Sequence, residues 1–230
     1  MLKPQKFVGV VVENKLLAPD VLKLSLKVPL SFGFTAGQFV TIKVNNGKES
    51  RMKSYSILNP PSQPGKLDFC IKILPDGFAS DIFKAAKEGD SFDITGPLGH
   101  FFFDEETLHE HWFICAGTGI TPLYSMLQEY VPRSPGKKFR LLFGARTQDH
   151  LLFYEEFRKM EKRYPYFTYF PILSRENWEG KMGHAQDHLG KDLQNKTFYI
   201  CGLKDLVLET KELLLNKGVD SKNIKFERYN

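Results

Sequence analysis

The chain has 230 residues, 42% of them hydrophobic and 26% charged, which is enough to bury the core of one large or two ordinary domains. Its net charge of +5 is mild, and it carries no basic run with interleaved aromatic residues, so nucleic-acid binding is not expected. No apolar run approaches the roughly 20 residues of a membrane span, and the N-terminus lacks a signal-peptide pattern. The three cysteines are far apart without CxxC spacing, so we expect a cytoplasmic protein with no metal or iron–sulfur site. We also expect a monomer.

Residues 1–104 predict a β domain. Alternating and β-branched residues indicate six strands: Phe7–Val12, Val21–Val28, Gln38–Val44, Lys53–Leu58, Leu67–Leu74 and Ser91–Thr95. Turn signals such as the run NPPSQPG at 59–65 separate them, and one helical segment, Ala79–Lys87, interrupts the series. Short strands at this spacing favour a closed antiparallel barrel, which leaves no exposed sheet edge.

Residues 105–230 predict a second domain of a different class, because apolar strand-like runs alternate with amphipathic helices. The expected strands are His111–Ala116, Phe139–Gly144, Phe167–Leu173, Phe198–Cys201 and Ile224–Arg228. The expected helices are Leu123–Tyr130, Leu151–Arg163, His184–Leu193 and Asp205–Lys217. This alternation is typical of a Rossmann-like parallel sheet with helices on both faces.

The run ICAGTGITP at 114–122 follows the first strand of this second domain. Glycines there let backbone N–H groups approach a pyrophosphate, and a helix N-terminus favours negative charge. Pro122 is compatible with this, since proline is well placed in the first helical turn, and Thr118 and Thr121 add hydroxyl donors. Taken alone, the run fits an ordinary strand-to-helix turn equally well.

Other polar groups follow later strands of the same domain. Ser174, Arg175 and Lys181 place a hydroxyl and two cations after the third strand, a reasonable cradle for an adenosine 2′-phosphate. Cys201 and Gly202 end the fourth strand on the same side of the sheet. A solvated polar loop and a small core cysteine are the plain alternatives.

The barrel half has two runs of interest. In RMKSYSI at 51–57, strand geometry puts Lys53 and Tyr55 on one face and Ser56 on the other, a set that suits a phosphate, a planar ring and a ring heteroatom. In DGFAS at 76–80, Gly77 and Ser80 stand where a helix begins, which suits a phosphate. An ordinary barrel strand and an ordinary turn explain the same residues.

Seven short motifs occur in order along nearly the whole chain: KSYSI, GFAS, GPLG, GTGITP, SRE, CGLK and a C-terminal ERY. In this order and spacing they resemble the ferredoxin–NADP(H) reductase family, and the plant-type reductases most. The resemblance implies a six-stranded antiparallel FAD-binding barrel followed by a Rossmann-like NADP(H)-binding domain. It implies a hydride passing between NADP(H) and FAD, and single electrons passing between FAD and ferredoxin or flavodoxin, which are acidic carriers.

The resemblance also implies site residues. Tyr55 would stack on the flavin ring and Ser56 would hydrogen-bond near its N5 atom. The flavin phosphates would be held by Lys53, Gly77 and Ser80, with the backbone of Cys70, Ile71 and Lys72 alongside. The pyrophosphate would lie on Gly117, Thr118, Gly119, Thr121 and Pro122, and the 2′-phosphate on Ser174, Arg175 and Lys181. Cys201, Glu227 and Tyr229 would line the hydride-transfer site, Tyr229 on the other flavin face. Ser54, Arg146, Gly202 and Leu203 complete the expected cofactor-binding set.

Two departures from the family pattern matter. The family usually has arginine two residues before the flavin tyrosine, where this chain has Lys53, with Arg51 nearby. Lysine neutralises a phosphate without the planar fork of arginine, so FAD binding, or FAD over FMN, is in question. The chain also continues for one residue, Asn230, past the stacking tyrosine.

Three other functions stay open. An NAD(P)H:flavin reductase uses flavin as a diffusing substrate, which a covering Tyr229 would hinder. An NADH-dependent reductase component of an oxygenase system would not need the cations near Ser174. A non-catalytic flavin-binding subunit would not need both half-sites in one chain.

Overall fold

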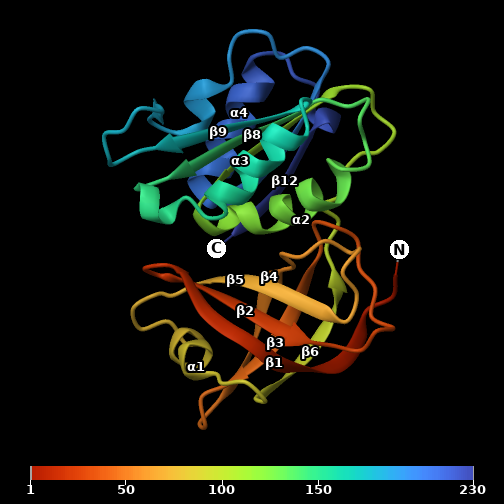
Figure 1. The fold of residues 1–230 in the computed structure, drawn as a ribbon, viewed down its shortest axis with the longest axis vertical. Helices are drawn as coiled ribbons and strands as arrows, with labels where there is room; N and C mark the ends of the chain where they lie inside the picture. Colours follow the sequence, from red (N-terminus) through yellow and green to blue (C-terminus); the bar gives the residue numbers. More distant parts are fainter. Residues whose placement is uncertain (1, 230) are drawn as a thin grey trace. The chain divides into compact units, whose positions relative to one another are not determined.

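The computed structural model describes residues 2–229 and separates the chain into two compact units (Figure 1). The first comprises residues up to Phe103 together with Tyr124–Glu129, and the second comprises Asp104–Leu123 together with the residues from Tyr130 onward. No helix among residues 2–229 is both long and apolar enough to cross a bilayer.

The first unit is one antiparallel sheet that curls into a half-barrel. Its strands are β1 Gln5–Ala18, β2 Val21–Lys27, β3 Phe39–Asn45, β4 Ser50–Ser56, β5 Lys66–Lys72 and β6 Ser91–Leu98. They lie in the order β4-β3-β6-β1-β2-β5, and the short helix α1, Ser80–Ala85, joins β5 to β6 (Figure 1). The predicted antiparallel fold of six strands is therefore confirmed.

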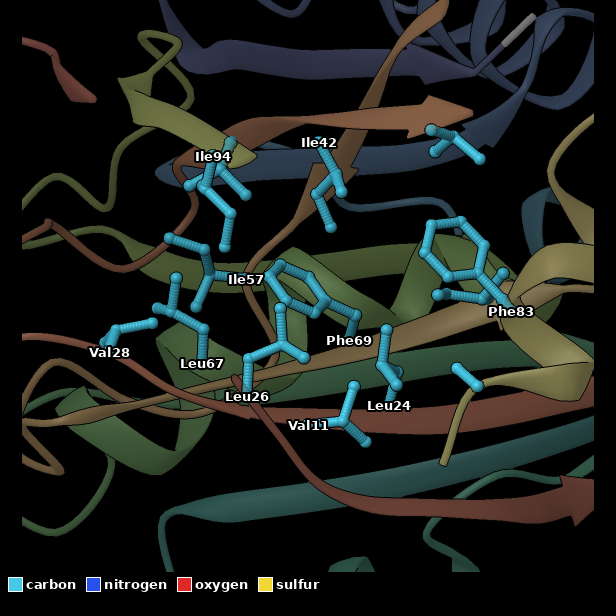
Figure 2. Close-up of a cluster of buried hydrophobic side chains, with 14 of the residues drawn as sticks. Val11, Leu24, Leu26, Val28, Ile42, Ile57, Leu67, Phe69, Phe83 and Ile94 are labelled. Atoms are coloured by element: carbon cyan, nitrogen blue, oxygen red, sulfur yellow. The ribbon is translucent and has the colours of Figure 1, made fainter. Parts of the chain in front are cut away.

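The curl of this sheet buries alternate residues of β3 and almost the whole of β2 and β5. Leu24 and Leu26 of β2 and Phe69 of β5 are fully buried, and their side chains point toward Ile42 and Ile94 from other strands (Figure 2). Burying apolar area of this kind is the main favourable term in folding. It also fixes the strand register, because a slip by one residue would turn each buried set outward.

The expectation of a closed barrel without edges needs a correction. β4 and β5 are the two edges of the sheet, and no continuous ladder joins them in the described part of the chain. They are connected just past the end of β4, where the Leu58 N–H group donates to the Asp68 carbonyl at 2.8 Å. Strand β4 ends at Ser56, two residues earlier than the apolar pattern indicates. The contact between the two edges is therefore made by residues of the loop that follows β4.

The second unit is a parallel sheet in the order β10-β9-β8-β7-β11-β12. Its strands are β7 Glu110–Ala116, β8 Phe139–Ala145, β9 Phe167–Leu173, β10 Lys181–Met182, β11 Lys196–Leu203 and β12 Ile224–Tyr229. Its helices are α2 Ile120–Tyr130, α3 Tyr154–Arg163 and α4 Lys204–Asn216, with short 3-10 turns η1 Gly117–Gly119, η2 Gln148–His150, η3 Ala185–His188 and η4 Ser221–Asn223. The Rossmann-like parallel fold is confirmed.

Helices cover both faces of this sheet. Phe157 of α3 packs against Phe167 and Tyr169 of β9, with ring centroids 6.3 and 5.1 Å apart. Val207 and Leu214 of α4 pack in a different cluster, which includes Ile172 of β9. Ile172 is separated from Tyr169 by an odd number of positions, so it lies on the opposite face of the sheet. Since successive strand residues point to opposite faces, α3 and α4 lie on opposite sides, as the sequence pattern predicts.

The expected helix over His184–Leu193 is wrong. Only Ala185–His188 form a turn, of the 3-10 type. Gly190 has φ +75, a left-handed conformation that ends a right-handed helix. Leu189 and Leu193 nevertheless pack into the α4-side core, which explains why their spacing resembles an amphipathic helix.

Candidate functional site

The inner face of β4 carries the first half-site. Lys53 pairs with Ile42 and Tyr55 pairs with Val40 in the β3–β4 register, and both partners are core residues. Lys53 and Tyr55 therefore share the inner face, as predicted, while Ser56 points to the other side and is buried.

Tyr55 is half-buried with its ring held by two phenylalanines. Its centroid lies 5.3 Å from Phe83 at 89° and 6.4 Å from Phe69 at 66°, both edge-to-face arrangements. Burial raises the pKa of Tyr55 to about 12, so the phenol is neutral at physiological pH. A ring fixed in this way and still partly exposed can stack on a planar ligand.

The cations near Tyr55 differ in how far they are already engaged. Arg51 pairs with Glu49 at 2.6 Å, and its guanidinium lies 4.4 Å from the centre of the Phe78 ring. Lys72 pairs with Asp20. Lys53 has no ion pair or side-chain hydrogen bond within residues 2–229, so it is the cation of β4 that is left to meet an anion.

The turn before α1 is built around Gly77 and Ser80. The Ser80 hydroxyl oxygen accepts a hydrogen bond from the Leu74 N–H group at 3.0 Å, and its own hydrogen remains to donate. A Cβ atom on Gly77 would lie 2.5 Å from the Ser80 Oγ atom. A side chain at position 77 would therefore displace the Ser80 hydroxyl, which holds the turn through its bond to Leu74.

The remaining expected residues of this unit lie on β5 and on the outer face of β4. The N–H and C=O groups of Asp68 bond to Asn59 and Leu58, so they point away from β2, toward the free edge of β5. Backbone groups of alternate residues point the same way, so those of Cys70 and Lys72 also face this free edge. The side chain of Ile71 is buried in the core, and Ser54 is exposed on the outer face of β4.

In the second unit, the GTG run forms η1 and leads directly into α2. A Cβ atom on Gly119 would lie 2.3 Å from the Cys201 carbonyl oxygen, so the turn touches the end of β11. Gly117 has φ +54, which glycine adopts without strain. The N–H groups of Thr118 and Gly119 lie ahead of Ile120, whose N–H group makes the first helical hydrogen bond, so they form an open pair of donors at a helix N-terminus.

The two residues that follow complete this turn. The Thr121 hydroxyl donates to the Thr118 carbonyl at 2.7 Å, so it braces the turn. Pro122 is buried within the first turn of α2, where its missing N–H group is no loss.

Two arginines stand beyond the carboxyl ends of neighbouring strands. The Ser174 N–H group donates to the Ala145 carbonyl and the Arg175 N–H group to the Arg146 carbonyl, both at 3.0 Å, so the β8–β9 pairing continues past the sheet. Arg146 and Arg175 are exposed, and neither forms an ion pair with a described residue. The structure thus brings Arg146, Ser174 and Arg175 together.

Lys181 is placed differently from its two expected companions. Lys181 lies on β10 and pairs with Ile172 of β9. Its ammonium lies 5.6 Å from the centre of the ring of Phe170, which comes earlier in β9. An unexpected carboxylate is nearby instead: Glu176 accepts hydrogen bonds from the N–H group of Gln148 at 2.8 Å and from its side chain at 3.0 Å. Glu176 is the glutamate of the SRE motif, and the sequence pattern predicts no role for it.

The ends of β11 and β12 form the last group. Cys201 is fully buried, lies opposite Glu227 in the register, and its thiol is hydrogen-bonded by the Tyr229 side chain. Burial raises the pKa of the Cys201 thiol well above its usual range and Glu227 adds to the effect, so the group is a neutral thiol. Gly202 is buried beside it and Leu203 is exposed.

Comparison with known proteins now decides the family. The sequence matches an oxidoreductase FAD-binding domain over residues 9–103 and an oxidoreductase NAD-binding domain over residues 113–212. It is 28% identical to ferredoxin–NADP reductase B of Sorangium cellulosum over the whole length of both chains. The chain belongs to the ferredoxin–NADP(H) reductase family.

The chain also resembles components of oxygenase systems. It is 27% identical to the reductase component DmpP of phenol 2-monooxygenase from Pseudomonas sp. strain CF600, over 93% of this chain and 62% of that protein. The chain therefore spans about three fifths of the length of that relative.

Solved structures agree in fold with this chain. Amycolatopsis cytochrome P450 reductase GcoB superposes with a TM-score of 0.92 at 24% identity, covering 99% of this chain and 71% of that one. A Neisseria gonorrhoeae ferredoxin NADP+ reductase with bound FAD and NADP gives 0.83 at 20% identity, covering 99% of both.

The residues of the two half-sites fit the two cofactors of the family. A partly exposed Tyr55 ring and an uncommitted Lys53 suit a planar ring that carries phosphates. Free N–H groups at the start of α2, together with Arg146 and Arg175, suit a dinucleotide with further negative charge. No group of three or more metal-ligating side chains gathers anywhere in residues 2–229.

Proposed function

We propose that the protein moves a hydride between NADP(H) and bound FAD, and single electrons between FAD and ferredoxin or flavodoxin. The observation that carries the choice of NADP(H) is the grouping of Arg146, Ser174 and Arg175 past β8 and β9. The full-length match to a ferredoxin–NADP reductase supports the choice of reaction, since both chains are covered completely.

FAD supplies the conversion between a two-electron hydride and single electrons when it is bound. In the first unit, Tyr55 orients the flavin ring by stacking, and Lys53 neutralises a flavin phosphate. To Ser56, the residue that follows Tyr55 at the end of β4, we assign a hydrogen bond near the reacting edge of the ring. Gly77, Ser80 and the backbone of Cys70 and Lys72 complete the phosphate and ribityl side.

In the second unit, the open N–H groups of η1 hold the pyrophosphate of the nucleotide. The guanidinium groups of Arg146 and Arg175 and the hydroxyl of Ser174 hold the 2′-phosphate through charge-assisted hydrogen bonds, which are about twice as strong as neutral ones. Lys181 adds a positive charge from farther back, because its ammonium is directed toward Phe170.

Cys201, Glu227 and Tyr229 form the nicotinamide end of this half-site in the proposal. The Cys201 thiol is neutral and cannot add to the nicotinamide ring as a thiolate would, so we assign it a packing role. Glu227, opposite Cys201 in the register, orients the nicotinamide or moves a proton. Correct orientation of two reacting rings is itself a large part of the rate.

An acidic one-electron carrier is the partner that the charge of the chain favours. The net charge of +5 attracts ferredoxin or flavodoxin, and attraction of this kind raises the association rate and weakens with salt. Rates of carrier reduction that do not depend on ionic strength would contradict this partner.

The test is the absorbance spectrum of the purified protein, followed by anaerobic titration with NADPH and separately with NADH. We expect retained flavin that is bleached at much lower NADPH than NADH concentration. A colourless protein that binds no added FAD would overturn the proposal.

A second candidate is an NADH-dependent reductase component of an oxygenase system. It is favoured by Glu176, because a carboxylate after such a strand can accept a hydrogen bond from the 2′-hydroxyl of NADH. Both Glu176 oxygens already accept hydrogen bonds from Gln148, which weighs against this use. Bleaching by NADH alone in the same titration would establish it.

A further inference from the structure

The segment that directly follows Ser56 is buried and fixed from both sides. Ile57, Leu58 and Asn59 are 0, 2 and 2% exposed. The Ile57 N–H group donates to the Gln38 carbonyl at 2.9 Å, beside β3, and the Leu58 N–H group donates to the Asp68 carbonyl at 2.8 Å, on β5. This segment is therefore the seam at which the two edges of the curled sheet meet.

Asn59 provides most of the side-chain hydrogen bonds of this seam. Its Oδ1 atom accepts from the Asp68 N–H group at 2.8 Å, and its amide NH2 group donates to the Lys66 carbonyl at 3.0 Å. The same NH2 group also reaches the Gln63 carbonyl at 3.4 Å. One side chain thus extends the ladder of β5 and ties down the loop between Asn59 and Lys66.

A third contact holds the backbone of Asn59 itself. The Ser125 hydroxyl donates to the Asn59 carbonyl at 2.8 Å, and Ser125 is fully buried. Ser125 belongs to the part of α2 that the first unit contains, Tyr124–Glu129. Asn59 is therefore fixed through its carbonyl, its Oδ1 atom and its NH2 group, only three residues after Ser56.

We propose that Asn59 is a positioning residue for the flavin site: it sets where Tyr55 and Ser56 lie with respect to β5. This inference rests on the proposed function, in which those two residues orient the flavin. Past Ser56, the Leu58 N–H group and the Asn59 side chain hold the end of β4 to β5 by hydrogen bonds. A displacement of about 1 Å at a reacting centre can cost up to about a hundredfold in rate.

The test compares three variants of the full chain after reconstitution with saturating FAD. Asn59→Ala removes the side-chain links, and Ser125→Ala removes only the donor to the Asn59 carbonyl. Asn46→Ala is the matched control, because the Asn46 Oδ1 atom accepts from the Lys48 and Glu49 N–H groups at 3.0 and 2.9 Å at the other end of β4. Stopped-flow reduction of bound FAD by NADPH gives the limiting rate and the half-saturating concentration, and thermal unfolding gives the stability.

We expect Asn59→Ala to lower the limiting rate roughly ten- to a hundredfold without changing the half-saturating NADPH concentration, and to shift the flavin absorbance bands. Ser125→Ala should show a smaller loss in the same direction, and it decides the question if Asn59→Ala does not fold. Asn46→Ala should keep the wild-type rate even if it unfolds at a lower temperature. A folded Asn59→Ala variant with the wild-type rate would overturn the role of Asn59 and leave the proposed function standing. If Asn59→Ala does not fold, a wild-type rate in Ser125→Ala would have the same meaning. A wild-type protein whose flavin neither nucleotide reduces would overturn the proposed function as well.

Discussion

Gly119 and Cys201 are in direct backbone contact: a Cβ atom on Gly119 would lie 2.3 Å from the Cys201 carbonyl oxygen and 2.7 Å from its carbonyl carbon. The first turn after β7 therefore rests on the end of β11, next to the thiol that we assign to the nicotinamide. Backbone atoms cannot move aside as a flexible side chain can, so a side chain at this position would force the turn away from β11.

We expect Gly119→Ala to lower the free energy of unfolding by about 1–3 kcal/mol, the usual cost of overpacking, because α2 must move away from β11. Urea unfolding measures the change. Gly136→Ala is the control, because a Cβ atom there meets nothing within 4 Å. Equal stabilities of the two variants would show that the contact carries no strain.

Arg175 should decide between NADPH and NADH. A hydrogen bond to a charged group contributes about 1.5–3 kcal/mol, so Arg175→Ala should lower kcat/KM for NADPH roughly 10- to 150-fold. The value for NADH should stay within about twofold, since NADH has no 2′-phosphate to lose. Steady-state kinetics with both nucleotides measure this, and Lys191→Ala removes an exposed lysine of the same unit as the control. Equal losses with both nucleotides would place Arg175 elsewhere in the nucleotide site.

The sequence could predict this half-site in part, and the reason lies in connectivity. Arg146, Ser174 and Arg175 each follow a parallel strand, and the carboxyl ends of neighbouring parallel strands meet at one edge, so their proximity follows from the strand pattern alone. The direction of Lys181 does not follow, because β10 is a strand of only two residues and its pairing with Ile172 is set by the loop before it.

In the first unit, too, the sequence predicts some residues of the site and not others. Alternation along β4 is enough to place Lys53 and Tyr55 on one face, since the strand period is two. The role of Asn59 could not be predicted in the same way. Its partners at Lys66 and Asp68 depend on how the loop 59–65 folds back, and the run NPPSQPG indicates a turn without fixing its path.

Lys53 should contribute to FAD affinity as the uncommitted cation of β4. We expect Lys53→Ala to raise the dissociation constant of FAD roughly tenfold, the effect of losing about 1.4 kcal/mol of charge attraction to a phosphate. Lys53→Arg should tighten binding, because a guanidinium binds phosphate in a planar, bidentate manner. Flavin fluorescence titration of the apoprotein measures both, with Lys48→Ala as the exposed control. Unchanged affinity in Lys53→Ala would remove Lys53 from the phosphate site.

His111 is a buried imidazole at the base of the second sheet, on β7. It is fully buried, its ring stacks on Phe139 with centroids 5.4 Å apart, and its Nδ1 atom lies 3.3 Å from the Tyr199 hydroxyl, which accepts from the Asp104 N–H group at 3.0 Å. Burial, with the nearby Lys137 charge, lowers the pKa of His111 to about 3. The folded protein thus keeps this histidine neutral in mild acid.

The consequence is a loss of stability in acid. An unfolded histidine has a pKa of about 6.5, so below that pH the unfolded chain takes up a proton that the folded chain refuses. The contribution of neutral His111 to the free energy of unfolding is fully present above about pH 6.5. It is lost as the pH falls from about 6.5 to about 3. The decrease is about 1.4 kcal/mol for each pH unit.

We expect His111→Phe to abolish this part of the pH dependence, because phenylalanine keeps the stack on Phe139 and does not titrate. At pH 7 the variant should be less stable by roughly 1 kcal/mol, since the hydrogen bond to Tyr199 is lost. Between about pH 6 and 4 its free energy of unfolding should decline less steeply than that of the wild type, so that the two curves cross. Urea unfolding at each pH gives the slopes, and His100→Phe, which removes an exposed imidazole, controls for the loss of a histidine as such. Parallel curves for wild type and His111→Phe would mean that His111 takes up its proton in the folded state.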